Sequence, residues 1–443
     1  MATPPIPSFR HGPWLPLSLI AALALAACGG GDGSSTGSNT LGGTISGLST
    51  DGLVLANGSD TLAVASGATG FTFDETIGSS YDVTVQTQPS GQTCQISGGS
   101  GSASGNVSSV TVTCRSYRVY VANTNSNTMA QFSVGSTGAL SALSTPTVAV
   151  SYMPSALVIN SDGSQAWLSY RDDETLSVLD VDSQGALSLS NLSGQAATFG
   201  YALALAPDAS QLYAVNYGGA SVSQFSVGSS GKLTALSAAT VSSGLAPYAM
   251  AITPDGAYAY VANASDDTIS QYAVGSGGAL TALSKATVSV SSYGSKPQGL
   301  AVAPGGGYLY VTLAGSAKVL SYAINAGTGT LSYSSSQSTG TTPRAIALTS
   351  DGTHAYVANA GSATVSQYLV SGGSLTPMAT RTVPTGSTPS GIAITPDNAQ
   401  LYVSNAGDGT LSQFSVGSGG ALSALSPATV STGGLAPVSV VAR

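Results

Sequence analysis

One phrase returns through most of this chain at nearly constant spacing, and it limits the possible folds more than any other feature. It reads "AYVANASDDTISQY" at 259–272, "AYVANAGSATVSQY" at 355–368 and "LYVSNAGDGTLSQF" at 401–414. The aromatic residues that open the phrase follow one another at intervals of 46 to 50 residues; they are Tyr120, Trp167, Tyr213, Tyr260, Tyr310, Tyr356 and Tyr402. A period of about 40–50 residues filled with short β-type segments is typical of a β-propeller. The phrase therefore indicates architecture rather than a catalytic motif.

Each repeat contains four strand-like segments. In one copy they read "PYAMAIT", "AYVAN", "TISQYAV" and "LTALSKATVSV", and turn sequences such as "PDG" and "GSGGAL" separate them. Four antiparallel strands with tight turns form one propeller blade. Only 7% of the residues are charged, against roughly 25% in average soluble proteins, so the long charged side chains of exposed helices are scarce. We predict an all-β chain.

The count of segments predicts how the ring closes. Segments of the first type begin near seven residues, which are Ser155, Tyr201, Tyr248, Gln298, Arg344, Ser390 and Val438. The repeat region nevertheless opens with a second-type segment, "YRVYVAN", and ends with a first-type segment, "APVSVVAR". The C-terminal strand must therefore complete the first blade, which removes exposed sheet edges. We predict a seven-bladed β-propeller over residues 116–443 with this C-terminal strand closure.

Two other recurring residue types are interpreted as scaffold. An asparagine ends the second segment in five repeats, at Asn123, Asn216, Asn263, Asn359 and Asn405. Asn tolerates left-handed backbone and bonds its own backbone in turns, so we expect these residues to shape turns. We likewise expect Asp255, Asp351 and Asp397 to be structural residues of hairpin turns.

A different pattern precedes the repeats. Residues 41–115 contain short β-type runs such as "YDVTVQT" and "SVTVTC", which predict a small, loosely immunoglobulin-like β-sandwich. Cys94 and Cys114 lie 20 residues apart in it, and we expect them to form a disulfide that staples the sandwich. A disulfide closing such a loop contributes about 3 kcal/mol in the chain-entropy model. The alternative, a metal-binding pair, lacks further Cys or His nearby, and we expect no metal.

The first 40 residues read as an export and anchoring segment. Residues 1–27 carry Arg10 and an uncharged apolar run of twelve residues, "PLSLIAALALAA", which is shorter than the about 20 residues that span a bilayer. The run ends in "LAAC", which resembles the lipobox of bacterial lipoproteins and marks Cys28 for lipid attachment; an ordinary signal peptide is the alternative. Residues 28–40 have the composition of a flexible tether. Since Gly29 rather than Asp follows the cysteine, we expect a lipid-anchored protein of the cell envelope at the outer membrane, facing the periplasm or the surface.

The units "AYVANA", "LYVSNA" and "PSGIAITPD" resemble YVTN-type repeats and the seven-bladed lactonase-like family, which includes bacterial 6-phosphogluconolactonases. The resemblance covers about 117–443 and is specific for the fold but weak for activity. The motifs of WD-repeat, sialidase and integrin-type propellers are missing from the sequence. The 41–115 module resembles domains that precede such propellers in bacterial lipoproteins.

Residues at the start of the first-type segments should surround the mouth of the propeller channel, where the family places its ligands. Two aromatic and two polar residues there, Tyr201, Tyr248, Gln298 and Arg344, could hold a sugar or an acidic ligand. Lys296 and Lys318 should approach Arg344 and complete a site for a carboxylate or phosphate. The alternatives are an ordinary polar channel rim and three scattered solubilising charges.

Turns between the second and third segments should bring further charges to the same face; they are Arg171, Asp172, Asp173, Glu174, Asp266, Asp267 and Asp408. Lactone hydrolysis needs a base to activate water and a donor for the oxyanion. Asp266 and Glu174 are candidate bases, although both are expected in exposed turns. His354 begins a second-type segment and should therefore lie on the opposite face. No catalytic triad, metal cluster or phosphate loop occurs in the sequence, so the catalytic residues stay unassigned and we expect no cofactor.

These features predict a ligand-binding or scaffold module of the cell envelope, with a lactonase acting on a sugar lactone as the alternative and an adhesion protein as a third hypothesis. The net charge of −8 becomes −9 once Arg10 is removed with the leader, which argues against nucleic acid as a partner. We expect a monomer whose partner is a small anionic or sugar-like ligand or an envelope protein. Membrane contact would be made only through the lipid.

Overall fold

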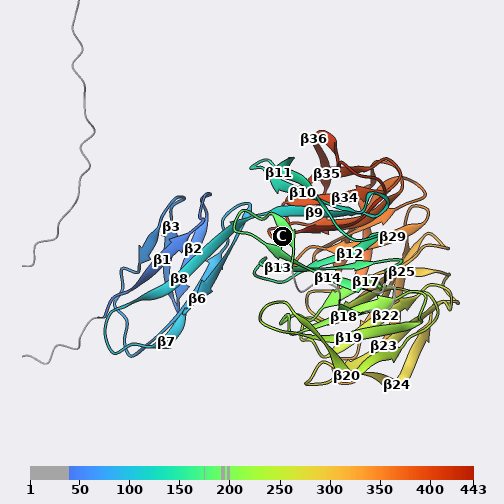
Figure 1. The fold of residues 1–443 in the computed structure, drawn as a ribbon, viewed down its shortest axis with the longest axis horizontal. Coiled ribbons are helices and arrows are strands. Elements are labelled where there is room, and N and C mark those ends of the chain that lie inside the picture. The colour runs from blue at the N-terminus through green and yellow to red at the C-terminus, as the bar shows by residue number, and fades with distance from the viewer. Residues whose placement is uncertain (1–38, 174, 191–194, 197–199) are drawn as a thin grey trace, which may run out of the picture. The chain divides into compact units, whose positions relative to one another are not determined.

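The computed structural model describes residues 39–173, 175–190, 195–196 and 200–443. The predicted leader, Cys28, nearly all of the predicted tether and Glu174 lie outside these residues. Asn39–Arg443 form one compact unit, in which eight strands precede a longer series of four-stranded sheets (Figure 1).

The first eight strands form two four-stranded sheets. One sheet has the order β4-β1-β8-β6, with β4 (Gly70–Thr72), β1 (Leu41–Ser46), β8 (Val107–Ser116) and β6 (Gln92–Ser97). The other has the order β3-β2-β5-β7, with β3 (Asp60–Val64), β2 (Leu53–Asn57), β5 (Ser80–Thr87) and β7 (Ser100–Ser102). Leu41, Leu53, Leu55 and Val110 are fully buried in one shared apolar core. The alternation of small apolar and polar residues along these strands gives each sheet one buried face.

The predicted disulfide is confirmed, although it does not join the two sheets. Cys94 of β6 and Cys114 of β8 are direct cross-strand partners in one sheet, with their Cα atoms 3.9 Å apart. An immunoglobulin domain carries its disulfide between its two sheets, and here β1 also runs parallel to β8. The sandwich is therefore immunoglobulin-like only in being built of two packed sheets.

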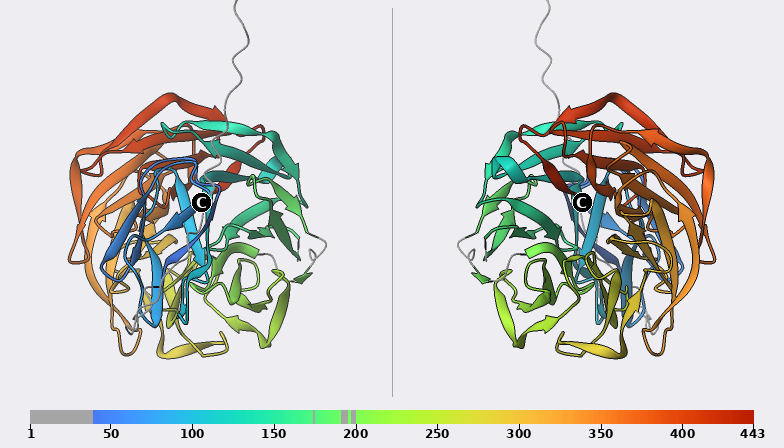
Figure 2. Two further views of the ribbon diagram at one scale, coloured as in Figure 1. Left: turned by 90° about the vertical axis from the view of Figure 1, so that its left-hand side faces the viewer. Right: turned by 90° about the vertical axis from the view of Figure 1, so that its right-hand side faces the viewer.

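The remaining strands form seven blades arranged as a ring (Figure 2). The innermost strand of each blade comes from the first-type segments: β37 (Pro437–Ala442), β12 (Pro154–Ile159), β17 (Gly200–Leu205), β21 (Pro247–Ile252), β25 (Pro297–Val302), β29 (Pro343–Leu348) and β33 (Pro389–Ile394). The second strands carry the recurring aromatic residue: β9 (Arg118–Asn123), β13 (Gln165–Tyr170), β18 (Gln211–Asn216), β22 (Tyr258–Asn263), β26 (Tyr308–Leu313), β30 (His354–Asn359) and β34 (Gln400–Asn405).

The outer half of each blade is equally regular. The third strands are β10 (Thr128–Val134), β14 (Thr175–Val181), β19 (Ser221–Val227), β23 (Thr268–Val274), β27 (Lys318–Ile324), β31 (Thr364–Ser371) and β35 (Thr410–Val416). The outermost strands are β11 (Leu140–Ala149), β15 (Leu187–Leu189) with β16 (Gln195–Ala196), β20 (Leu233–Ser242), β24 (Leu280–Ser289), β28 (Leu331–Ser338), β32 (Ser374–Pro384) and β36 (Leu422–Ser431). One short 3₁₀ turn, η1 (Thr124–Ser126), follows β9.

The predicted closure of the ring is confirmed. Strand β37 pairs antiparallel with β9, so that Val440 lies opposite Val121 and the first blade has the order β11-β10-β9-β37. Val440 is buried with Val119, Val121 and Leu411 of the seventh blade. The strand therefore covers an edge that would otherwise be open and fills the space between two blades.

The recurring aromatic residue connects one blade to the next. In six blades its side chain donates a hydrogen bond of 2.6–2.9 Å to a backbone carbonyl in the turn between the third and fourth strands of the following blade. The pairs are Tyr120 to Gly185, Trp167 to Gly231, Tyr213 to Gly278, Tyr260 to Gly329, Tyr356 to Gly420 and Tyr402 to Gly138. The exception is Tyr310, whose buried hydroxyl has no partner within the described residues.

The glutamine of "SQY" forms a second connection between blades. Gln271, for example, donates to the carbonyl of Lys285 in its own blade and accepts from the backbone N–H of Leu331 in the next blade. Gln131, Gln224, Gln367 and Gln413 have equivalent acceptor bonds. The repeated phrase thus satisfies buried polar groups between blades, as its interpretation as scaffold requires.

The expectation that the repeated asparagines shape turns through left-handed backbone was wrong. Asn263 and its equivalents are the last residues of their strands and are fully buried, and Asn123 has a φ of −93° rather than left-handed backbone. Their Nδ2 groups donate to a Ser or Thr hydroxyl five residues further on, as from Asn263 to Thr268 at 3.0 Å. The side chain therefore links the second and third strands across the turn and does not shape the turn itself.

Candidate functional site

Seven β-bulges direct one side chain from each blade into the central channel. In every innermost strand the pairing with the second strand skips the residue after the first one, as between Pro343 and Ala345, where Arg344 is the unpaired residue. The same irregularity occurs in β12, β17, β21, β33 and β37, and in β25 the pairing skips both Gln298 and Gly299. A bulge bends the strand and turns a side chain away from the regular pleat, which explains why the seven bulged residues gather in the channel.

The bulged residues line a single cavity of about 340 Å³. They are the seven residues that begin the first-type segments: Ser155, Tyr201, Tyr248, Gln298, Arg344, Ser390 and Val438. Two positions further along the strands the lining is apolar, with Leu203, Met250, Leu300, Ile346, Ile392 and Val440. The cavity therefore has a polar ring next to an apolar wall, the composition expected of a small-molecule site.

Two of the seven ring residues serve the scaffold. The Ser155 hydroxyl donates to the carbonyl of Gly200 at 2.7 Å, and the Ser390 hydroxyl donates to the carbonyl of Pro437 at 2.9 Å. These bonds tie neighbouring innermost strands together. The remaining polar ring residues, Tyr201, Tyr248, Gln298 and Arg344, are the ones left to meet a ligand.

Arg171 is a further residue of the cavity. It follows β13 in the turn to β14 and lines the same space as Tyr201 and Arg344. Its guanidinium carbon lies 4.8 Å from the centre of the Tyr201 ring, a distance at which a cation is attracted to the face of an aromatic ring. The repeat pattern predicted only that Arg171 lies on this face of the propeller. The one feature of the sequence that singled out Arg171 was its positive charge, because the chain has few charged residues.

Three buried polar atoms in this cavity have no hydrogen-bond partner within the described part of the chain. They are Nε of Arg171, Nε of Arg344 and Oε1 of Gln298. Leaving a buried donor or acceptor unpaired costs about 1–3 kcal/mol, and more for a charged group. Two unpaired cationic donors and one unpaired acceptor thus belong to residues that line one space, which favours a site that a ligand completes.

Two tyrosines, Tyr201 and Tyr248, form the aromatic side of the cavity, and a third, Tyr217, packs against them. The ring of Tyr201 lies 4.5 Å from that of Tyr248 and 5.2 Å from that of Tyr217, measured between ring centres. The Tyr201 hydroxyl donates to the Tyr248 hydroxyl at 2.9 Å. Burial, and then the neighbouring Tyr248, raise the pKa of Tyr201 well above its usual value, while Arg171 and Arg344 lower it. Tyr201 therefore stays protonated at neutral pH and acts as a hydrogen-bond donor.

The two candidate lysines are not among the residues that line this cavity. Lys296 is exposed, and its backbone N–H donates to Asp267 Oδ1 at 2.7 Å. Lys318 begins β27, and its Nζ donates to the carbonyl of Tyr293 at 3.0 Å. Of the three cations predicted to converge, the cavity contains Arg344, and its second cation is Arg171.

The carboxylates of this face hold the connections between blades. Asp266 accepts from the backbone N–H of Leu245 at 2.6 Å, and Asp408 accepts from that of Ser387 at 2.7 Å. Asp173 accepts from the hydroxyl of Ser151. These bonds give Asp266, a candidate base, a structural role, and the other candidate, Glu174, lies outside the described residues.

Among the described residues that line the cavity there is no Asp, Glu, His or Cys. His354 begins β30, and its Nδ1 lies 2.7 Å from the Thr353 hydroxyl. It also packs against Gly420 of the turn between β35 and β36, where an added Cβ would meet the imidazole ring. That turn lies at the end of the blades away from the mouth, as the sequence predicted for His354.

The chain is thus a seven-bladed propeller whose innermost strands line one central cavity. The family model described as "Lactonase, 7-bladed beta-propeller" matches residues 200–440, more than half of the chain. The protein therefore belongs to this family. No curated protein sequence matches the chain.

Solved structures show the same architecture. A candidate 6-phosphogluconolactonase from Bacteroides fragilis is 21% identical, with a TM-score of 0.64 over 74% of this chain and 98% of that one. A periplasmic gluconolactonase from Pseudomonas aeruginosa is 20% identical, with a TM-score of 0.62 over 73% and 98%. Hydrazine synthase from Kuenenia stuttgartiensis is 15% identical, with a TM-score of 0.51 over 67% and 94%. At these identities the likeness shows the fold alone, and unrelated chemistries share it.

Proposed function

We propose that the propeller mouth binds a small hydroxylated anion of the sugar-acid class, so that the protein acts as a ligand-binding module. The observation that carries the proposal is a set of unpaired buried atoms on residues that line one cavity: two arginine Nε donors and the Gln298 Oε1 acceptor. The two guanidinium groups favour a ligand with an anionic oxygen, because charge-assisted hydrogen bonds are the strongest that a guanidinium forms. Gln298 Oε1 calls for a donor, such as a hydroxyl group, on the same ligand.

The rest of the cavity suits such a ligand. Arginine binds a carboxylate or phosphate through two parallel hydrogen bonds. Tyr201 and Tyr248 offer hydroxyl groups and ring faces beside Arg171. The apolar wall that includes Leu203 and Met250 fits the carbon skeleton of a sugar acid. A cavity of about 340 Å³ is within the usual range for ligand pockets.

Isothermal titration with gluconate, 6-phosphogluconate and uncharged glucose tests this proposal. We expect both anions to bind and glucose to bind much more weakly. Arg344→Gln should weaken anion binding by about tenfold or more, the usual effect of losing one charge-assisted hydrogen bond. Arg381→Gln, which removes an exposed arginine on β32, is the matched control. Equal binding of glucose and gluconate, or an unaffected Arg344→Gln variant, would contradict the proposal.

Lactone hydrolysis is the second candidate function, and the family match favours it. Arg171, Arg344 and the Tyr248 hydroxyl, which accepts the hydrogen bond from Tyr201, could stabilise the oxyanion that forms when water attacks a lactone carbonyl. A base to activate that water is missing from the described lining residues. Binding without turnover is therefore the better-supported function. Gluconolactone hydrolysis well above the spontaneous rate, lost in Arg344→Gln, would instead establish the enzyme.

We also propose that the protein is lipid-anchored in the cell envelope through Cys28. The "LAAC" sequence supports this anchor, and the periplasmic gluconolactonase with the same fold gives a parallel location. In the part of the chain that the structure describes, no helix is long and apolar enough to cross a membrane. Cys28→Ser should move the protein from the membrane fraction to the soluble fraction; retention of the variant on membranes would remove the anchor.

A further inference from the structure

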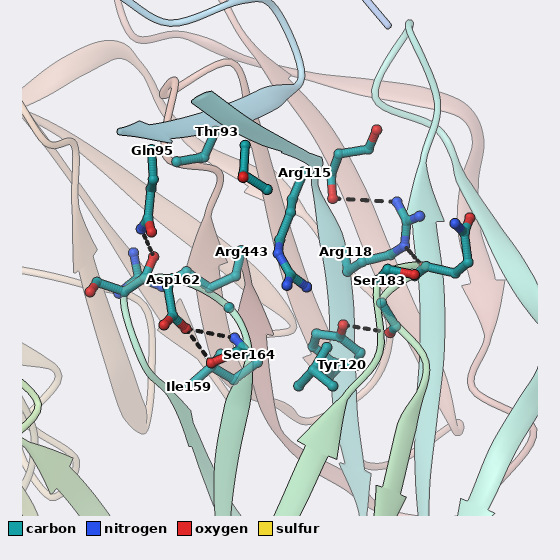
Figure 3. Close-up of a pocket in the computed structure, with 17 residues that line it drawn as sticks. Thr93, Gln95, Arg115, Arg118, Tyr120, Ile159, Asp162, Ser164, Ser183 and Arg443 are labelled. Carbon is teal, nitrogen blue, oxygen red and sulfur yellow. Dashed lines mark hydrogen bonds between the residues drawn. The ribbon is translucent and has the colours of Figure 1, made fainter. Parts of the chain in front are cut away.

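A second cavity lies where the sandwich meets the first two blades, away from the mouth (Figure 3). It has a volume of about 240 Å³. The sandwich contributes residues of β6 and β8, such as Gln95 and Arg115, and the propeller contributes turns of the second blade. Hydrogen bonds from Gln95 Nε2 to the carbonyl of Ser161 and from Arg115 Nη1 to the carbonyl of Asp182 cross the junction.

Three arginines reach this cavity from three different segments. Arg115 stands near the end of β8, Arg118 begins β9, and Arg443 follows β37. The chain has seven arginines in total and a net charge of −8, so nearly half of its arginines gather in one small space. Figure 3 shows Arg115 between Gln95 and Asp162 on one side and Arg118 on the other. Like charges held close together repel each other unless an anion neutralises them.

The guanidinium groups keep donors available. A guanidinium has five N–H donors. Arg115 donates to the carbonyl of Asp182 at 3.2 Å, and Arg118 donates to the carbonyls of Gln184 at 2.9 Å and Tyr117 at 3.0 Å. These partners are neutral backbone groups, which position the arginines without cancelling their charge.

One lining residue carries a side-chain carboxylate, and it is engaged elsewhere. Asp162 Oδ1 accepts from both the backbone N–H and the hydroxyl of Ser164, at 2.8 and 2.5 Å. These bonds belong to the tight turn between β12 and β13. These bonds hold Asp162 in its own turn but leave its negative charge, so that one carboxylate side chain accompanies three arginines among the described lining residues.

From this geometry we infer that the cavity binds a phosphate-class oxyanion, either free or as the phosphate group of a small carbohydrate. One arginine satisfies a planar carboxylate by bidentate contact, whereas three guanidinium groups from three segments suit a tetrahedral, multiply charged group. Hydroxyl and amide side chains of Thr93, Gln95 and Ser183 line the same space and suit further oxygens of the ligand. Because Arg115 belongs to the sandwich and Arg118 to the propeller, the bound anion would fasten one to the other.

The test uses the full chain in an Arg171→Gln/Arg344→Gln background, which removes the cationic groups of the mouth. Titration at constant ionic strength with inorganic phosphate, and separately with glucose 6-phosphate, should show one site per chain. Adding Arg115→Gln and Arg443→Gln should weaken binding by about tenfold per arginine. Adding Arg381→Gln instead should leave it unchanged. Tighter binding of glucose 6-phosphate identifies a carbohydrate phosphate, and equal binding identifies the free oxyanion.

A second measurement needs no variants. Phenylglyoxal modifies accessible arginines, and mass spectrometry locates the modified residues. Phosphate should protect Arg115 and Arg443 from modification and leave Arg381 unprotected. Any of three results would overturn the inference. They are no phosphate binding in the Arg171→Gln/Arg344→Gln background, unchanged affinity after loss of Arg115 and Arg443, and no protection of these two arginines by phosphate. None of these results bears on sugar-acid binding at the mouth, so each proposal can be refuted without refuting the other.

Discussion

Two structurally equivalent sets of positions in the seven blades differ sharply in how uniform they are. On the second strands the aromatic position holds Tyr in six blades and Trp in one, and six of the seven side chains bond to the next blade. At the bulge of the innermost strands the residues are Ser, Tyr, Tyr, Gln, Arg, Ser and Val. Six blades make the same contact at the first position, whereas the second position faces the channel. The position with nearly the same residue in every blade thus belongs to the scaffold, and the position whose residue varies from blade to blade lines the cavity.

The exception among the aromatic positions follows from a difference in turn length. Strands β31 and β32 are joined by Gly372 and Gly373 alone, whereas five residues separate β10 from β11. The shortened turn offers Tyr310 no carbonyl, and its hydroxyl is buried without a partner in the part of the chain described. The contact therefore depends on the turn of the next blade as much as on the tyrosine.

Loss of ring closure should have the largest effect. A chain ending at Ala436 lacks β37, exposes the edge of β9 and loses the buried Val440. We expect its melting temperature to fall by about 10 °C or more, because several buried contacts and a row of backbone hydrogen bonds disappear together. Differential scanning calorimetry measures this effect. An unchanged melting temperature would show that the first blade is complete without β37.

Removal of a single hydroxyl group should have an intermediate effect that depends on the blade. Tyr260→Phe removes the hydrogen bond to the Gly329 carbonyl and should cost about 1 kcal/mol of unfolding free energy. Tyr310→Phe is the matched control, since it removes a hydroxyl without a described partner and should be neutral or slightly stabilising. Denaturant unfolding compares the two variants. Equal losses would refute the idea that this bond explains the uniformity of the position.

Acid should weaken the scaffold slightly through its turns. Hydrogen bonds, first from Thr253 and then from the backbone of Ala257, lower the pKa of Asp255 below its ordinary 3.8. Thr349 and then Thr353 do the same for Asp351. A lowered folded-state pKa means that the stabilisation is present above the unfolded pKa and disappears as the pH falls through the folded pKa. An Asp255→Asn/Asp351→Asn variant should therefore lose less stability than the parent between about pH 5 and pH 2; an identical pH profile would contradict this.

The smallest effect on stability is expected at the mouth. Arg344→Gln removes a guanidinium whose buried Nε has no described partner, so the melting temperature should stay within about 2 °C of the parent value. The same variant should lose anion binding. A large fall in the melting temperature would show that Arg344 belongs to the scaffold and not to the site.

Sequence reasoning located those elements that the repeat determines. The period of the aromatic residues predicted the blades, and the leftover segments at both ends predicted that β37 joins β9. The positions that face the channel followed from the start of each first-type segment. The pairing of Cys94 with Cys114 followed from their spacing in a module without other candidate partners.

What the sequence could not predict depends on side-chain direction and on packing between unlike parts. Lys296 and Arg344 both lie near the start of an innermost strand, but only the residue at the bulge enters the cavity. Arg171 lies in a turn, where the repeat gives no rule for the direction of its side chain, and its contact with Tyr201 decides its place. The trio of arginines at the junction arises from segments far apart in the sequence, which no periodicity connects.

The bulges have a consequence for how such a protein can change during evolution. Each blade supplies one channel residue that takes no part in the pairing register, so a substitution there leaves the neighbouring hydrogen-bond ladder intact. Apart from Ser155 and Ser390, whose hydroxyls bond neighbouring strands, the ring can therefore change its chemistry through successive single mutations while the hydrogen-bond ladders persist. A chain of this design can acquire a new specificity without passing through unstable intermediates.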